Sequence, residues 1–157
     1  MEQQKVQLPE WTKVAEVELV YKTKVKASER PKINSSKDSY ELLRQLWNFG
    51  KMEMLEEFKI LLLNRGNRVM GVYEVSSGGI TGTVADPRLI LAAAIKSLAV
   101  GIVLCHNHPS GNLTPSRADE QLTRKIKEAA AYHDITVLDH LILTGESYLS
   151  FADEGLL

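Results

Sequence analysis

Two histidines and an aspartate in one short stretch have the residue types and spacing of a metal site. His106 and His108 lie two positions apart at the end of an apolar run, and Asp119 follows a segment with proline and glycine. Imidazole nitrogens and a carboxylate oxygen are common zinc ligands, and catalytic zinc sites have three protein ligands and one open position. The stretch therefore predicts a metal site formed by these three residues, and a metal-assisted hydrolase is the leading interpretation.

The histidines follow a run that favours a buried strand. Residues 99–105 are almost all apolar and include β-branched side chains, a pattern typical of a strand covered on both faces. Alternate residues of an extended chain point to the same side, so His106 and His108 can converge on one ion. Cys105 then faces the other way, and we expect a buried structural thiol there rather than a ligand.

The segment after the histidines predicts a turn followed by a helix. Residues 109–112, Pro-Ser-Gly-Asn, are turn-forming, and Thr114 and Pro115 fit the N-cap and the first helical position. Ser116 and Asp119 would then share a face in the first turn, where Ser116 could hydrogen-bond a bound water or a developing oxyanion. Both residues also have a structural alternative, because Ser can bond backbone N–H groups there and Asp can stabilise the helix N-terminus by its charge.

The spacing His-x-His, seven residues, Ser-x-x-Asp resembles the JAMM motif of the JAB/MPN metalloprotease superfamily. The longer string His-Asn-His-Pro-Ser-Gly at 106–111 is similar to the RadC branch of that superfamily. The resemblance covers residues 37–157 and implies an α/β fold of the JAB/MPN, cytidine-deaminase-like type, with three layers in which helices flank a mixed β-sheet. Further segments that carry it are residues 56–64, 86–88, 138–140 and 150–152.

The resemblance also implies a glutamate that acts as general acid and base. A carboxylate can take the proton of the attacking water and return it to the leaving amine. In the RadC branch this glutamate lies two residues before a Phe that opens a strand, which corresponds to Glu56 and Phe58. Strand alternation turns the neighbouring Glu57 away, although both glutamates could instead be solvated charges at a strand start. The implied enzyme is a Zn²⁺-dependent peptidase or isopeptidase with Glu56 and Ser116 as catalytic residues and an unspecified peptide or protein substrate.

Two other classes of function stay open. RadC proteins carry a DNA-repair label, so a metal-dependent DNA repair or DNA-processing accessory protein is the first alternative. With 19 basic and 20 acidic residues the net charge does not support DNA binding, and Asp119 is the only carboxylate in the expected ligand set. A non-catalytic zinc-binding interaction module is the second alternative, and the complete ligand set argues against it.

Length and composition indicate one soluble domain. A chain of 157 residues that is 44% hydrophobic and 25% charged can bury a single sizeable core. The apolar runs are too short to span a bilayer, and the first residues lack the apolar segment of a secretory signal. The single cysteine excludes an intrachain disulfide and fits a reducing compartment, so we expect a cytoplasmic protein without membrane contact.

Residues 1–36 precede the resemblance and are expected to form an N-terminal extension. Alternating apolar and polar residues over 17–25 predict an edge strand, which could pair with the sheet, with a second copy in a homodimer or with a partner. Residues 27–36 are polar and linker-like. Ser36 fits the N-cap of a helix that follows, whose apolar side would be formed by Tyr40, Leu43 and Trp47.

The rest of the chain predicts a hairpin, a helix and two further strands. Residues 58–63 and 68–75 would pair through the turn at 64–67, and a glycine-rich loop at 76–83 could line a cleft. Asp86 and Pro87 predict the start of a helix that runs to about residue 99. The remaining strands are expected at residues 135–143 and 148–151.

The adjacent polar residues Asp139 and His140 are unusual in the apolar strand predicted at 135–143. Polar side chains inside such a strand need hydrogen-bond partners. Ligand histidines usually donate their second N–H to a neighbouring group. One member of this pair could therefore support the metal site, while a purely structural role for both remains the alternative.

Overall fold

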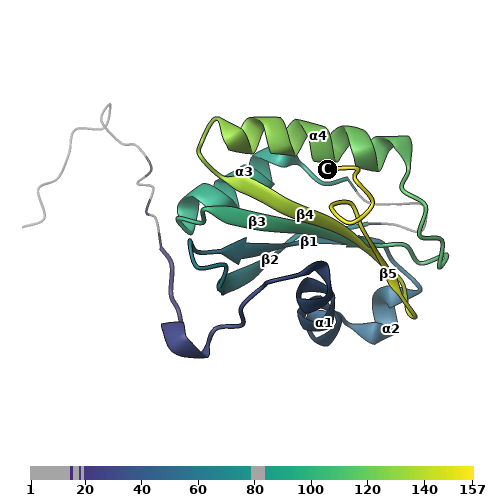
Figure 1. Ribbon diagram of the computed structural model, residues 1–157, viewed down its shortest axis with the longest axis horizontal. Coiled ribbons are helices and arrows are strands. Elements are labelled where there is room, and N and C mark those ends of the chain that lie inside the picture. The colour runs from purple at the N-terminus through teal and green to yellow at the C-terminus, as the bar shows by residue number, and fades with distance from the viewer. Residues whose placement is uncertain (1–14, 16–17, 19, 79–83) are drawn as a thin grey trace, which may run out of the picture.

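The computed structural model describes residues 15, 18, 20–78 and 84–157. Five strands form one sheet, and helices cover both of its faces (Figure 1). The strands are β1 (Glu57–Leu63), β2 (Val69–Ser77), β3 (Gly101–Asn107), β4 (Thr136–Leu143) and β5 (Tyr148–Ser150). The helices are α1 (Ser36–Leu46), α2 (Phe49–Met52), α3 (Pro87–Lys96) and α4 (Arg117–Ala131), besides a short 3₁₀ turn at Ala27–Glu29.

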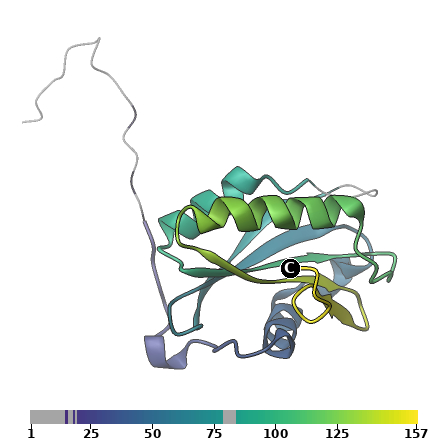
Figure 2. The same cartoon turned by 45° about the horizontal axis from the view of Figure 1, so that its top comes forward.

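The sheet is mixed, with the strand order β2-β1-β3-β4-β5. The pairs β1–β2, β1–β3 and β4–β5 are antiparallel, whereas β3 and β4 are parallel. Two parallel strands must be joined by a crossover connection. Helix α4, which follows β3 and precedes β4 in the sequence, supplies it by running over one face of the sheet (Figure 2). The expected α/β fold with a mixed sheet between helices is confirmed.

Both faces of the two central strands are buried, because β1 and β3 are apolar nearly throughout. One face packs against α3 and α4, and the other packs against α1 and α2 (Figures 1 and 2). Cys105 lies on the α1 face and is fully buried, as the alternation from His106 predicts. The sheet thus holds the end of β3, where the histidines lie, between two packed layers.

The described part of the predicted N-terminal edge strand, residues 20–25, does not form a strand. Val20, Tyr21 and Val25 are exposed, so the rest of the described structure does not bury the apolar side chains of this segment. The Tyr21 hydroxyl donates to the carbonyl of Met70 on β2 at 2.8 Å, and this side-chain contact replaces ladder pairing. Val17 and Leu19, which belong to the same pattern, lie outside the described residues.

Two helix boundaries also differ from the prediction. The N-cap of α1 is Ser35 rather than Ser36, because the Ser35 hydroxyl accepts from the Asp38 N–H while the Asp38 carboxylate accepts from the Ser35 N–H. Helix α3 starts at Asp86 and Pro87 as expected but ends at Lys96, and Leu98 has a left-handed φ of 58°. The glycine-rich loop falls largely on residues 79–83, outside the described residues. None of the described helices combines the length and apolarity needed to cross a bilayer.

Candidate metal centre

His106 is placed by the pairing of β3 with β1. The antiparallel register sets Phe58 opposite His106, and the two rings stack with their centroids 5.8 Å apart. His106 is only 1% exposed, so its imidazole cannot satisfy its nitrogens with bulk water. The residues of α4 and β4 must therefore provide partners for both ring nitrogens.

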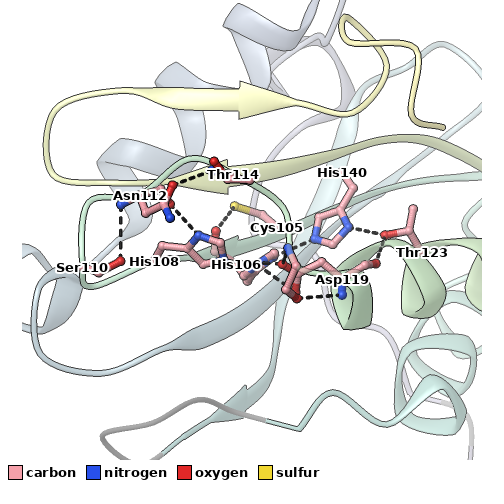
Figure 3. A network of polar contacts seen from close by, with 10 residues as sticks. Cys105, His106, His108, Ser110, Asn112, Thr114, Asp119, Thr123 and His140 are labelled. Carbon is pink, nitrogen blue, oxygen red and sulfur yellow. Dashed lines mark hydrogen bonds and ion pairs between the residues drawn. The ribbon is translucent and has the colours of Figure 1, made fainter.

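The structure brings the three predicted ligands together (Figure 3). One ligand atom each from His106, His108 and Asp119 lies within 4.8 Å of the others. The Nε2 atoms of the two histidines are 3.0 Å apart. The two Asp119 carboxylate oxygens lie 3.3 Å from Nε2 of His106 and 3.5 Å from Nε2 of His108. Three donor atoms therefore converge from the end of β3 and the start of α4.

Helix α4 begins two residues later than the Thr114–Pro115 pattern predicts. Its N-cap is Ser116, whose hydroxyl accepts from the Asp119 N–H at 3.0 Å while the Asp119 carboxylate accepts from the Ser116 N–H at 2.8 Å. This reciprocal pair satisfies two free N–H groups at the helix start, which Thr114 as N-cap could not do. The structural alternative for Ser116 and Asp119 is thus realised, and Asp119 faces the histidines at the same time.

The second ring nitrogen of each of the two histidines is held by a neighbour. Nδ1 of His108 lies 2.6 Å from the carbonyl oxygen of Asn112, which can only accept, so His108 carries its proton on Nδ1. Its Nε2 therefore directs a lone pair at the centre. Nδ1 of His106 lies 2.8 Å from Nε2 of His140, a fully buried residue of β4.

The electrostatics of the cluster are dominated by Asp119. Burial opposes ionisation of this carboxyl, but His106 and His108, when an imidazole carries a hydrogen toward the carboxylate, outweigh burial and hold the pKa of Asp119 far below its usual range. The Asp119 carboxylate in turn raises the pKa of His108 against the effect of burial. A neutral His108 lone pair beside an ionised carboxylate needs a proton or a metal cation between them. The donor set therefore fits a divalent ion with nitrogen and oxygen ligands.

The structure separates the two adjacent glutamates. Glu57 is buried on the α1 face, where its carboxylate lies 3.8 Å from the ammonium of Lys59. Glu56 immediately precedes β1, and extending the β1–β3 register by two residues beyond Phe58 would set it opposite His108. Its negative charge is among the groups that raise the pKa of His108. The role of Glu56 in proton transfer stays a prediction, whereas Glu57 points away from the cluster.

Three residues of the site were not assigned a role from the sequence. Asn112 holds His108, and Thr123 on α4 contacts His140 at 2.6 Å. Asn107 is fully buried, accepts from the Glu57 N–H at 2.7 Å and donates to the carbonyls of Met52 and Leu55. Asn107 thus fixes the start of β1 against the end of β3. Helical spacing could have indicated Thr123, which lies four residues after Asp119 on the same face.

A mixed sheet flanked by helices, with a His-x-His pair ending a central strand and an aspartate opening the next helix, defines a JAB/MPN-type domain. The chain belongs to the family described as the RadC-like JAB domain, whose model matches residues 33–156. The cluster of His106, His108 and Asp119, which could hold a metal ion, lies entirely within the matched region.

Relatives support the same family. The chain is 46% identical over 125 residues to a UPF0758 protein of Flavobacterium johnsoniae, and 40% identical over 135 residues to one of Porphyromonas gingivalis. These matches cover 80% and 85% of this chain, but 53% and 60% of the relatives. The chain therefore spans little more than half the length of these curated relatives.

Proposed function

We propose that this protein is a zinc-dependent peptidase or isopeptidase. The observation that carries the proposal is the convergence of His106, His108 and Asp119, whose ligand atoms lie within 4.8 Å of one another. Two imidazoles and one carboxylate are a ligand set of catalytic zinc sites, which keep a fourth position open. Family membership supports the same class of chemistry, because the motif that carries the family resemblance is the one that forms the cluster.

Each residue of the centre has a defined task in this proposal. His106, His108 and Asp119 would hold the ion, which when bound polarises the scissile carbonyl and lowers the pKa of water. Glu56 takes up the proton that the attacking water loses and delivers it to the leaving amine nitrogen. The Ser116 hydroxyl accepts from the Asp119 N–H and keeps its own hydrogen free to donate to a developing oxyanion.

Adjacent glutamates on opposite faces of the sheet provide a matched test. Glu56→Gln and Glu57→Gln make the same change in shape and charge, one beside the cluster and one behind it. Hydrolysis would be followed on a library of fluorogenic peptides and ε-lysyl isopeptides, and zinc would be measured by mass spectrometry. We expect Glu56→Gln to keep its zinc and lose about 100-fold or more in rate, while Glu57→Gln stays active.

The same measurements identify the alternative. A zinc-loaded wild-type protein that cleaves none of these substrates would favour the non-catalytic interaction module. Glu56→Gln with wild-type activity would remove Glu56 from the mechanism and contradict the proposed proton transfer.

A further inference from the structure

A continuous chain of hydrogen bonds connects His106 and Asp119, two of the proposed metal ligands, behind the site (Figure 3). It runs from Nδ1 of His106 to Nε2 of His140 at 2.8 Å, and from Nδ1 of His140 to the Thr123 hydroxyl at 2.6 Å. The same hydroxyl lies 2.6 Å from the backbone carbonyl oxygen of Asp119. The chain thus begins and ends on ligand residues and passes through β3, β4 and α4.

The direction of each bond follows from the one group that can only accept. The carbonyl oxygen of Asp119 has no hydrogen, so the Thr123 hydroxyl must donate to it. The hydrogen of that hydroxyl is then committed, and its oxygen accepts from the Nδ1–H of His140. Nε2 of neutral His140 is consequently an acceptor, and His106 must donate its Nδ1–H to it.

The last step leaves Nε2 of His106 without a hydrogen. That nitrogen is the one that faces His108 and Asp119 in the centre. A histidine can bind a metal only through a nitrogen that carries a lone pair, so the tautomer of His106 decides whether it can serve as a ligand. If the hydroxyl were absent, His140 could hold its hydrogen on Nε2 and donate it to His106, which would move the His106 hydrogen to the metal side.

We infer that Thr123 and His140 are positioning residues that set the ligand tautomer of His106 through the carbonyl of Asp119. This inference rests on the proposed metal site and adds two residues that do not touch the ion. His140 is fully buried between the rings of His106 and Phe151, and Thr123 is 2% exposed. Bulk water therefore cannot take the place of Thr123 or His140 as a hydrogen-bond partner in this chain.

Substitutions at Thr123 test the inference without changing a ligand. Thr123→Val removes the hydroxyl at nearly constant volume, and Thr123→Ser keeps it. Thr144→Val is the matched control, because Thr144 is also a buried threonine whose hydroxyl is hydrogen-bonded, at the turn between β4 and β5. Zinc dissociation constants would be measured on the full chain by competition with a chromophoric chelator. The ¹⁵N spectra of the histidine rings in the metal-free proteins would report which nitrogens carry hydrogen.

We expect the metal-free wild-type protein to hold His106 and His140 with their hydrogens on Nδ1. Thr123→Val should lose this arrangement and bind zinc about 10- to 100-fold more weakly. Thr123→Ser should recover both properties, and Thr144→Val should keep both. If Thr123 had a purely structural role, Thr123→Val would change the thermal stability but would leave the His106 tautomer unchanged, and Thr123→Ser would have no lost tautomer to restore. If Thr123→Val does not fold, Thr123→Ala removes the same hydroxyl without adding a methyl group beside the imidazole.

Unchanged zinc affinity in Thr123→Val, or a Thr123→Ser protein as weak as Thr123→Val, would overturn the inference. A wild-type protein that takes up no zinc would instead overturn the proposed function. The two failures are distinguishable, because the ring spectra of the metal-free proteins decide the tautomer chain independently of zinc and of hydrolysis.

Discussion

The sheet carries one polar cluster on each face, near the same ends of β1 and β3. In the lysine cluster on the α1 face, the ammonium of Lys59 lies 2.9 Å from Glu74, 3.8 Å from Glu57 and over the ring of Trp47. In the histidine cluster on the α4 face, His106, His108 and Asp119 bring their acceptor atoms together. Among the described residues, no lysine or arginine forms an ion pair with Asp119.

The difference shows two ways to place positive charge beside a buried carboxyl group. The lysine cluster contains its own cation, which is covalently part of the chain and always present. The histidine cluster has only imidazoles, so its positive charge must come from a proton or a metal ion. The first arrangement is suited to structure and the second to reversible binding.

The largest expected effect is the removal of the imidazoles from the histidine cluster. The double variant His106→Ala/His108→Ala should retain no stoichiometric zinc, because a single carboxylate then remains of the ligand set. His133→Ala is the control, since this histidine is exposed and lies after α4. Metal content by mass spectrometry checks the prediction. Equal zinc in the double variant and in the control would refute the assignment of the ligands.

Removal of the cation from the lysine cluster should act on stability alone. Lys59→Met leaves Glu57 buried without its charge partner and should cost about 3–5 kcal/mol of unfolding free energy. Adding Glu57→Gln should restore part of this loss. Urea denaturation measures the free energy, and zinc affinity should stay at the wild-type level. A parallel loss of zinc affinity would show that the two faces are coupled and would break the comparison.

The metal affinity of the histidine cluster should depend on pH. Asp119 raises the pKa of His108, so the metal-free protein keeps a second ring proton, on Nε2 of His108, up to a higher pH than an ordinary histidine does. Zinc must displace this proton, and its apparent affinity should fall about tenfold per pH unit below that pKa and level off above it. Chelator competition between about pH 5.5 and 8 measures the slope. A flat profile would mean that His108 binds no proton that competes with zinc.

The smallest effect is expected at Asp139, a buried carboxyl group whose hydrogen-bond donors among the described residues are all neutral. It accepts from the Ser150 hydroxyl and from the N–H groups of His140 and Ala152, yet burial raises its pKa. A raised pKa favours the protonated folded form, so this contribution to stability is present at acid pH and is lost as pH rises through the folded-state pKa. Asp139→Asn should remove the dependence and change neutral-pH stability by no more than about 1 kcal/mol.

Urea unfolding of metal-free wild type and Asp139→Asn at acid and neutral pH measures this difference. Asp139→Asn should be the more stable protein at neutral pH, where the wild type buries an ionised carboxylate. This difference in unfolding free energy should shrink toward acid pH, where Asp139 is protonated. A stability difference that grows on acidification would have the opposite sign and would show that the hydrogen bonds to Asp139 outweigh its burial.

Local patterns were sufficient for the elements and ligands that lie close together in the sequence. The hairpin turn at residues 64–67, the start of α3 at Asp86 and the burial of β3 all follow from short-range rules. The three predicted ligands converge in the structure, and the sequence could group them because one strand–turn–helix segment contains them. The predicted start of α4 was wrong because two capping patterns overlap there. The reciprocal Ser116–Asp119 bonds are more favourable than the Thr114–Pro115 pattern.

Features that depend on tertiary packing were beyond the sequence pattern. The partners of His140 are set by tertiary structure, because the parallel pairing of β4 with β3 brings it beside His106 and the packing of α4 brings it beside Thr123. The alternation of residues 17–25 resembles a strand, but over the described residues 20–25 no apolar layer covers it. Periodicity reports what a segment could bury, and only the rest of the fold decides whether it does.

The order of these residues along the chain has an evolutionary consequence. The proposed ligands and the two proposed positioning residues all lie within the continuous unit β3–α4–β4, whereas Glu56 precedes a separate hairpin that Asn107 joins to β3. Under the proposed function, mutations in the hairpin would abolish catalysis while ion retention is inherited intact. Descendants of such a domain would therefore be expected to diverge into metal-holding and hydrolytic lineages, with changes at Glu56 marking the branch point.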